Sequence, residues 1–253
     1  MALSKNEIKY VKSLHLKKFR QKYNNFIVEG DKIVRELLDA TQFSIEALYA
    51  EEKWLKAHSA GIRLNNSQVY QVAPSELDRI SSLKTPNQVL LIAQQPTFRY
   101  TPDKLNSSLS IYLDDIRDPG NLGTIIRIAD WFGISNIFCS PGCATWTNPK
   151  VVQASMGGFL RVQIHTIELQ ELRNAVPKLS ILGMMLDGHD IRKMERPKAG
   201  LIVIGNESRG ITPLNQGLLT DRITIPRPPK GGAESLNAAV ATGIICAQWA
   251  LEE

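Results

Sequence analysis

Apolar runs alternate with segments of helical spacing from residue 110 to the end of the chain, and this alternation constrains the fold more than any other feature. The apolar runs predict strands at residues 110–114, 136–140, 162–165, 179–184, 201–205 and 222–225. The segments of helical spacing cover residues 122–132, 150–156, 169–176, 213–219 and 235–249. Apolar strands that alternate with helices indicate a mostly parallel sheet covered on both faces. We therefore expect an α/β fold for this part of the chain.

The residues before this region form a separate, smaller block. Strands are predicted at residues 26–30, 45–50, 69–73 and 89–93, and helices from residue 31, over 52–58 and from Pro74. This pattern predicts a small layered α/β domain. Residues 95–109 carry two prolines and many polar side chains, which is typical of a linker. The expected organisation is a domain at 1–94, a linker at 95–109 and a domain at 110–253.

The composition excludes several classes of protein. With 43% hydrophobic and 22% charged residues, the chain is neither mainly disordered nor collagen-like. Three cysteines, an odd number, argue against a disulfide framework and fit a reducing cytoplasm. No apolar stretch reaches the roughly 18 residues of a membrane-spanning helix, and the start of the chain lacks the apolar core of a secretory signal. We expect a soluble protein of the cytoplasm.

The positive charge is concentrated at the start of the chain. The net charge is +5, and residues 1–22 hold seven basic side chains and one acidic one. Such a segment can bind phosphates through counterion release, although a solvated helix face would have the same composition. The aromatic residues Tyr10, Phe19, Tyr23 and Phe26 lie among these charges. They could stack on bases or belong to a core.

Two glycine-bearing loops each follow a predicted strand. Residues 114–127 contain Gly120 and Gly123 and lead into a helix. This is a position at which α/β proteins bind ligands, but the spacing is not the dinucleotide fingerprint and a plain tight turn stays possible. Residues 201–211 contain Gly-Asn-Glu-Ser-Arg-Gly. Ser208 lacks the spacing of a nucleophile elbow and no histidine is spaced to pair with it, which disfavours a serine hydrolase.

A third glycine-bearing loop follows the strand that ends at Pro226. Ser235 can cap the helix that comes next, and in that helix Ala239, Gly243 and Ala247 repeat at a spacing of four. Such a face of small residues permits close packing against another backbone. Cys139 and Cys143 are too few for a zinc site, which needs four ligands, and Cys246 is the only other thiol. We expect no metal.

Taken together, the three loops resemble the motifs of the SpoU (TrmH-like) family of RNA ribose 2'-O-methyltransferases. The resemblance rests on Asn121 and Arg127 in the first loop, Gly-Asn-Glu-Ser-Arg-Gly in the second, and Ile-Pro followed by Ser-Leu-Asn-Ala-Ala-Val-Ala in the third. It covers residues 110–250. The Phe-Ile-Val-Glu-Gly-Asp-Lys run of the first block resembles the amino-terminal substrate-binding domain of many members, which is similar to ribosomal-protein-type (L30e/L7Ae) RNA-binding folds.

The resemblance implies an S-adenosylmethionine cofactor, a homodimer and a trefoil knot of the SPOUT type in the carboxyl-terminal domain. It implies that the cofactor contacts the backbone at Gly205, Ile225 and Leu236, with Asn206 and Glu207 beside it. The acceptor site would consist of Asn121, Arg127, Glu207, Ser235 and Asn237. Two positions depart from the family pattern: residues 227–230 lengthen the third loop, and Ser208 stands where glycine is common.

The expected function is S-adenosylmethionine-dependent 2'-O-methylation of a ribose in structured RNA. The extra domain favours 23S ribosomal RNA over transfer RNA, by family association. A non-catalytic RNA-binding or ribosome-associated factor is the alternative from another class. A small-molecule methyltransferase is disfavoured by the basic amino-terminal domain. Helical spacing alone places Arg127 opposite the apolar side of its helix, facing solvent, whereas the resemblance places it beside the target ribose.

Overall fold

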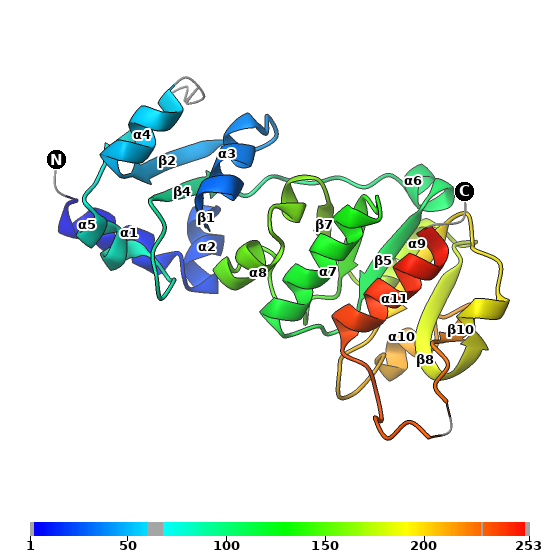
Figure 1. The fold of residues 1–253 in the computed structure, drawn as a ribbon. Coiled ribbons are helices and arrows are strands. Elements are labelled where there is room, and N and C mark those ends of the chain that lie inside the picture. Colours follow the sequence, from blue (N-terminus) through cyan, green and yellow to red (C-terminus); the bar gives the residue numbers. More distant parts are fainter. Residues whose placement is uncertain (1–2, 60–67, 229, 251–253) are drawn as a thin grey trace. The chain divides into compact units, whose positions relative to one another are not determined.

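The computed structural model describes residues 3–59, 68–228 and 230–250 (Figure 1). The chain forms two compact units. The first unit runs to Thr97 and also includes Thr147–Leu160, and the second consists of Phe98–Trp146 and the chain from Arg161 onward. The predicted boundaries at 94 and 110 stay a prediction. None of the helices within the described ranges is long and apolar enough to cross a membrane.

The first unit is built on a mixed sheet of four strands in the order β1-β4-β2-β3. Its central pairs are antiparallel and β3 lies parallel to β2. The strands are β1 (Asn25–Glu29), β2 (Ile45–Ala50), β3 (Gln68–Gln71) and β4 (Val89–Gln94). The helices are α1 (Lys5–Ser13), α2 (Lys17–Tyr23), α3 (Asp31–Asp39), α4 (Glu52–His58) and α5 (Pro74–Ile80). The four predicted strands and three predicted helices of this block are therefore all present.

Helices α1 and α2 occupy the basic segment, for which the sequence left a solvated helix face open but gave no helix bounds. Ser4 and Glu7 form a capping box that starts α1, and Ile8, Val11 and Leu14 pack into the core of the sheet. The sequence implied that all the basic side chains of this segment could bind a phosphate, but the structure shows that one of them cannot. Arg20 is 2% exposed, and its guanidinium donates to the carbonyl oxygens of Leu14 and His15 at 3.0 and 2.9 Å. The six lysines of the segment remain exposed.

The segment Thr147–Leu160 contributes α8 (Pro149–Ala154) and the 3-10 turn η2 (Gly158–Leu160) to the first unit. Gln153 Nε2 donates to the carbonyl oxygen of Glu29 at 2.7 Å. The Phe159 ring lies edge-on to Phe26 and Phe43, with ring centroids 5.9 Å apart in both pairs. Because Phe26 is fully buried in this cluster, it belongs to the core and is not available to stack on a base.

The second unit is built on six strands in the order β10-β8-β9-β5-β6-β7, and every pair is parallel. This confirms the predicted parallel sheet. The strands are β5 (Leu109–Leu113), β6 (Asn136–Cys139), β7 (Gln163–Thr166), β8 (Ile181–Asp190), β9 (Gly200–Ile204) and β10 (Asp221–Thr224). The helical elements are α6 (Pro102–Ser107), α7 (Pro119–Trp131), α9 (Leu169–Ala175), η3 (Ile191–Lys193), α10 (Pro213–Gln216) and α11 (Ala238–Ala250).

Helices cover both faces of this sheet. On one face, Tyr112 and Val203 share a core cluster with Leu172 of α9 and Leu105 of α6. On the other face, α7 and α11 lie side by side across the strands (Figure 1). Helix α6 lies inside the stretch that the sequence predicted to be a linker, where Leu105 is 1% exposed. The trefoil knot and the L30e-like fold implied by the resemblance stay predictions.

Two helix starts differ from the sequence prediction. Helix α7 begins at Pro119 because the Asp118 carboxylate accepts from the backbone N–H of Asn121 at 2.8 Å. The predicted cap of α11 by Ser235 is wrong. Asn237 caps α11 instead, since its Oδ1 accepts from the backbone N–H groups of Ala239 and Val240 at 2.9 and 3.3 Å. Asparagine and serine are similarly good caps, so the residue that directly precedes the helix, Asn237, forms the cap.

The stability of the second unit is expected to depend on pH through His165. Its imidazole stacks on Phe138 with ring centroids 4.9 Å apart, and burial lowers its pKa to about 4. The unfolded chain binds a proton near pH 6.5, whereas the folded chain resists it until about pH 4. The free energy of unfolding therefore falls as the pH falls through this window, by about 3 kcal/mol in total.

Urea unfolding of the wild type and of His165→Phe between pH 7.5 and 5 tests this expectation. The difference in unfolding free energy between the two proteins should shift toward His165→Phe by about 2 kcal/mol at pH 5, because the variant has no imidazole to protonate. The other three histidines are present in both proteins and cancel from the difference. A difference that does not change with pH would contradict the role assigned to His165.

Candidate functional site

Three loops leave the same edge of the second sheet. The first loop (residues 114–118) follows β5, the second loop (205–212) follows β9, and the third loop (225–237) follows β10. Because all the strands are parallel, the carboxyl ends of β5, β9 and β10 meet at one edge. Open α/β sheets bind their ligands at this edge. The fold thus brings together the three segments in which the sequence places its candidate residues.

A chain of side-chain hydrogen bonds joins these segments. Asn121, in the first turn of α7, donates through Nδ2 to Oε1 of Glu207 in the second loop. Asn237, at the end of the third loop, donates through Nδ2 to Oδ1 of Asn121 at 2.9 Å. Three of the five predicted acceptor-site residues are therefore in direct contact. We call Glu207, Asn121 and Asn237 the amide–carboxylate chain.

The second loop is held in place by Asn206. Its Nδ2 donates to the carbonyl oxygen of Asp115 at 2.9 Å, and its Oδ1 accepts from the backbone N–H groups of Ser208 and Arg209 at 3.0 and 3.2 Å. The backbones of Asn206 and Gly210 also exchange two hydrogen bonds, at 3.0 and 2.8 Å. Asn206 thus shapes the loop that carries Glu207 and ties it to the first loop.

Aspartates of the first loop form contacts that the sequence did not single out. The Asp114 side chain is 2% exposed and accepts from the backbone N–H of Thr212 at 2.7 Å. Asp115 has a left-handed backbone, with φ at 60°, and its carboxylate pairs with Arg117 at 2.8 Å. This ion pair raises the pKa of the Arg117 guanidinium. Their only sequence signal was a place directly after an apolar strand.

The segment after β6 supports the first loop from its other side. Ser140 Oγ accepts from the backbone N–H of Asp115 at 2.9 Å, and Cys143 Sγ accepts from that of Ile116 at 3.3 Å. The hydrogen bond with Cys143, aided by burial, raises the pKa of the Cys139 thiol. Both thiols are buried and serve packing and positioning. Within the described ranges, no three His, Cys, Asp or Glu side chains form a group that could hold a metal ion.

The remaining predicted residues do not join the hydrogen-bonded chain. Arg127 is exposed on α7, as helical spacing predicted, and makes no hydrogen bond or ion pair with any described residue. Ser235 is exposed in the third loop, and Leu236 beside it is 45% exposed. Ile225 is half-buried directly after β10. Their roles stay predictions.

The arrangement combines groups of three chemical kinds. Backbone groups at the ends of the strands can bind a small polar ligand, and the carboxylate of Glu207 suits a ligand that carries a positive charge. The guanidinium group of Arg209 is exposed in the second loop and suits an anion such as a phosphate. One edge of the sheet could therefore bind a cationic small molecule and an anionic polymer at the same time.

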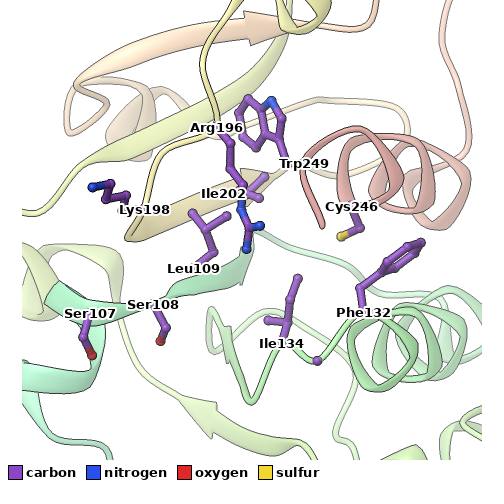
Figure 2. A pocket seen from close by; sticks show the side chains of 11 residues that line it. Ser107, Ser108, Leu109, Phe132, Ile134, Arg196, Lys198, Ile202, Cys246 and Trp249 are labelled. Carbon is purple, nitrogen blue, oxygen red and sulfur yellow. The ribbon is translucent and has the colours of Figure 1, made fainter. Parts of the chain in front are cut away.

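A cavity lies at the opposite edge of the same sheet, where β5 begins (Figure 2). Its volume is about 170 Å³, and it is lined by Leu109, Ile134, Cys246 and Trp249 together with the basic residues Arg196 and Lys198. None of the predicted site residues lines it. The cavity and the candidate site are therefore separate features of the second unit.

Comparisons with known proteins match both parts of the chain. A model of the SpoU rRNA Methylase family matches residues 108–247, and a model of the MRM3-like substrate binding domain matches residues 5–91. The chain is 29% identical to the 23S rRNA (guanosine(2553)-2'-O)-methyltransferase RlmP of Bacillus subtilis, over 96% of this chain and 95% of that protein.

Solved structures match over nearly the full length as well. A TrmH-family protein from Porphyromonas gingivalis is 35% identical, with a TM-score of 0.87 and 98% of both chains covered. An rRNA methyltransferase from Sinorhizobium meliloti with bound S-adenosylmethionine is 27% identical, with a TM-score of 0.86, over 98% of this chain and 96% of that one. The similarity thus extends over both units of the chain.

Proposed function

The chain belongs to the SpoU rRNA methylase family, and from this premise we propose that it transfers a methyl group from S-adenosylmethionine to the 2'-hydroxyl of a ribose in ribosomal RNA. The observation that carries the proposal is the amide–carboxylate chain, which joins the three family motifs at the ligand-binding edge of the sheet. A protein that had kept only the fold would not need these polar residues. Their presence favours an enzyme over a non-catalytic RNA-binding factor.

The residues at the three strand ends fit S-adenosylmethionine. We assign its binding to the backbone at Gly205, Ile225 and Leu236, with Asn206 holding the second loop against the first. The carboxylate of Glu207 suits the positive charge of a sulfonium group. When bound, the cofactor supplies an activated methyl group, so the chemistry needs no metal ion.

The protein would contribute alignment and charge to the reaction. Methyl transfer needs the ribose oxygen, the methyl carbon and the sulfur in line, and holding reactants in such a geometry can supply about 7–11 kcal/mol of the barrier. The exposed Arg127 can bind the RNA phosphate and stabilise the oxygen as negative charge develops on it. Ser235, exposed in the third loop, can donate to the same sugar.

The substrate that we favour is the RNA of the large ribosomal subunit, and we place the enzyme in the cytoplasm. The relative from Bacillus subtilis, which is named for 23S rRNA, matches nearly the whole length of the chain. The first unit also matches a substrate-binding domain model. A transfer RNA is the second candidate, and a small-molecule substrate would leave the exposed lysines of the first unit without a function.

Mapping of 2'-O-methyl groups in total RNA, with and without the gene, tests the proposed function. We expect one position in 23S rRNA to lose its methyl group in the deletion strain and to regain it when the purified protein and S-adenosylmethionine are added to that RNA. Loss of a transfer RNA position would move the substrate to transfer RNA. No lost position, and no methyl transfer in vitro, would refute the enzymatic proposal.

The lysines of α2 are expected to bind the RNA backbone. Lys17, Lys18 and Lys22 are exposed, and their reversal to glutamate should weaken RNA binding without affecting cofactor binding. Each lost phosphate contact lowers the number of released counterions, so the slope of log K against log salt should flatten by about two to three units. Filter binding at several salt concentrations measures this slope.

The matched control is Lys53→Glu, which reverses one exposed charge on α4 of the same unit. This variant should keep the salt slope of the wild type. If the triple variant also keeps that slope, the α2 lysines are ordinary solvated surface and the RNA binds elsewhere.

We further propose a homodimer that forms through α11. The face of small residues lies toward α7 of the same chain, since a Cβ on Gly243 would lie 3.7 Å from Ile128 Cδ1. The apolar residues beside that face are open to a partner: Val240 is 51% exposed and Ile244 is 38% exposed. A second copy of the chain would cover both.

Replacement of Val240 and Ile244 by lysine is expected to convert the dimer into a monomer, because four buried like charges would oppose association in each dimer. Light scattering at micromolar concentration measures the mass. Leu186→Lys, at a position that is 77% exposed on β8, is the control and should stay dimeric. A wild-type protein that is monomeric and active would refute the dimer.

A further inference from the structure

The segment that joins β8 to β9 is strongly basic and has no part in the proposed methyl transfer. Residues 191–198, which we call the basic return segment, carry four exposed basic side chains and one acidic one. Arg192 pairs with Asp190 at 2.7 Å. Lys193 and Lys198 make no hydrogen bond or ion pair with any described residue, so the charges of these two lysines are available to an anion.

The basic return segment runs from one edge of the second sheet to the other. Strands β8 and β9 are parallel, so the chain must return from the carboxyl end of β8 to the amino end of β9. At the start of the segment, Asp190 pairs in register with Thr224, directly before the third loop, and η3 packs against α11. At its other end, Gly200 begins β9. The basic residues thus lead from the edge that carries the third loop to the opposite edge.

The basic return segment ends at the cavity where β5 begins. The wall of this cavity is mostly apolar and includes the rings of Phe132 and Trp249, and Arg196 and Lys198 line the same cavity. Figure 2 shows the Arg196 side chain extending into the space between Leu109 and Phe132. The volume of about 170 Å³ is the space of about five or six water molecules, and a drug-sized ligand needs roughly 300–1,000 Å³. The cavity therefore suits a single flat ring, such as a nucleobase.

The cavity lies on a different side of α11 from the proposed dimer contact. At 100° per residue, Trp249 lies about half a turn around the helix from Val240. Trp249 is 1% exposed and lines the cavity, whereas Val240 is 51% exposed. The face of α11 that a second copy would cover is therefore not the face that borders the cavity.

We propose that the basic return segment and this cavity form an RNA-binding site of the second unit, separate from the acceptor site. Lys193, Arg196 and Lys198 bind phosphates of a single-stranded stretch of the substrate, and the cavity accepts one of its bases. The inference rests on the proposed function, which supplies RNA as the partner. Proteins bind single strands in this way, with basic side chains for the backbone and aromatic ones for the bases.

Binding of a ten-nucleotide oligouridine and of a ten-unit abasic ribose-phosphate chain separates the two parts of the site. Lys193→Glu combined with Lys198→Glu should weaken both ligands about tenfold or more. The slope of log K against log salt should flatten by about one to two units, since each phosphate contact on a single strand contributes about 0.7. The control combines Lys53→Glu with Arg99→Glu, which also reverses two exposed charges, and should keep affinity and slope. Two double variants with the same affinities would overturn the phosphate contacts.

Cys246→Phe tests the cavity. Cys246 is 2% exposed and lines the cavity, so a phenyl ring at this position would take up the space of the base. The variant should bind oligouridine about tenfold more weakly, within the range for the loss of one stacked base, and should bind the abasic chain within threefold of the wild type. Equal effects on both ligands, or no effect on oligouridine, would overturn the placement of a base in the cavity.

Photo-cross-linking of the wild type keeps the test valid if Cys246→Phe fails to fold. An oligouridine that carries one 4-thiouridine should attach, on irradiation, to the peptide that holds Phe132 or to the one that holds Trp249. An excess of uridine 5'-monophosphate should leave this cross-link in place. Cross-links confined to the first unit and the three loops would overturn the site. Full protection by the mononucleotide would show that the cavity binds a free nucleotide and would overturn the RNA contact.

A failure of this inference is distinct from a failure of the proposed function. With the RNA substrate, the double change at Lys193 and Lys198 should raise KM about tenfold and leave kcat and the cofactor dissociation constant unchanged. If the wild type is active and the double change leaves KM unaltered, the methyl transfer stands and the second RNA site is wrong. If the wild type is inactive but still forms the cross-link in the cavity, the proposed function fails and the RNA site stands.

Discussion

Arg127→Ala is expected to bind S-adenosylmethionine almost normally and to lose about 100-fold or more in kcat, as when one preorganised electrostatic group is removed. The cofactor dissociation constant should hold because Arg127 makes no hydrogen bond or ion pair with the described residues of the three loops. Truncation therefore leaves the amide–carboxylate chain in place. The loss in kcat should appear because the guanidinium is exposed on α7 and is therefore available to a substrate.

The chemistry of the side chain decides which role Arg127 can have. A guanidinium group stays protonated in proteins and has no acceptor atom, so Arg127 is a poor choice for removing the ribose proton. Its planar fork suits a phosphate or a developing oxyanion. Arg127→Lys keeps the positive charge but loses the fork, so it should fail as well.

Single-turnover methyl transfer to an RNA fragment, with calorimetry of cofactor binding, measures both effects. Arg35→Ala is the matched control, because it removes an exposed arginine that pairs with Asp31 on α3 of the first unit; such surface pairs are worth about 0–1 kcal/mol. If Arg127→Ala turned over at nearly the rate of the wild type, Arg127 would be an ordinary solvent-exposed residue, as helical spacing alone predicts.

Local signals were sufficient to predict most of the fold from the sequence. Helix α4 and strand β2 have the predicted bounds, because each apolar run is bordered by polar residues. Helices α1 and α2 were missed, because Ile8, Val11 and Leu14 are three isolated apolar residues among lysines and give a weak helical period. Their burial depends on a core that also includes residues far along the chain, such as Leu77 and Leu90.

The candidate site was predictable only in part, and for a physical reason. The motifs identified Asn121, Glu207 and Asn237, but the hydrogen bonds that join them span 86 and 116 residues of sequence. The supports from Asp114, Ser140 and Cys143 also act across long separations. The residue types alone do not predict such contacts, since in the sequence a buried aspartate directly after a strand cannot be told from any other turn residue.

Gly205→Ala should abolish cofactor binding and lower the melting temperature of the second unit. A Cβ at this position would overlap the backbone of Gly210 and Ile211 and would lie 2.6 Å from the Gly210 carbonyl oxygen. Backbone atoms cannot move aside as a side chain can, so the end of the second loop must shift. Overpacking of this kind costs about 1–3 kcal/mol, occasionally more.

The shift of the second loop would also disturb the candidate site. Asn206 and Gly210 exchange backbone hydrogen bonds at 3.0 and 2.8 Å, and Glu207 lies between them. If Gly210 moves away, this pairing opens and the Glu207 carboxylate leaves its position beside Asn121. Gly217→Ala is the control, because its Cβ would meet only the carbonyl oxygens of Leu214 and Pro213, at 3.5 and 4.0 Å, in ordinary contact. Calorimetry should show no cofactor binding by Gly205→Ala and normal binding by Gly217→Ala, whereas equal binding by both would mean that the close approach at Gly205 has no part in the cofactor site.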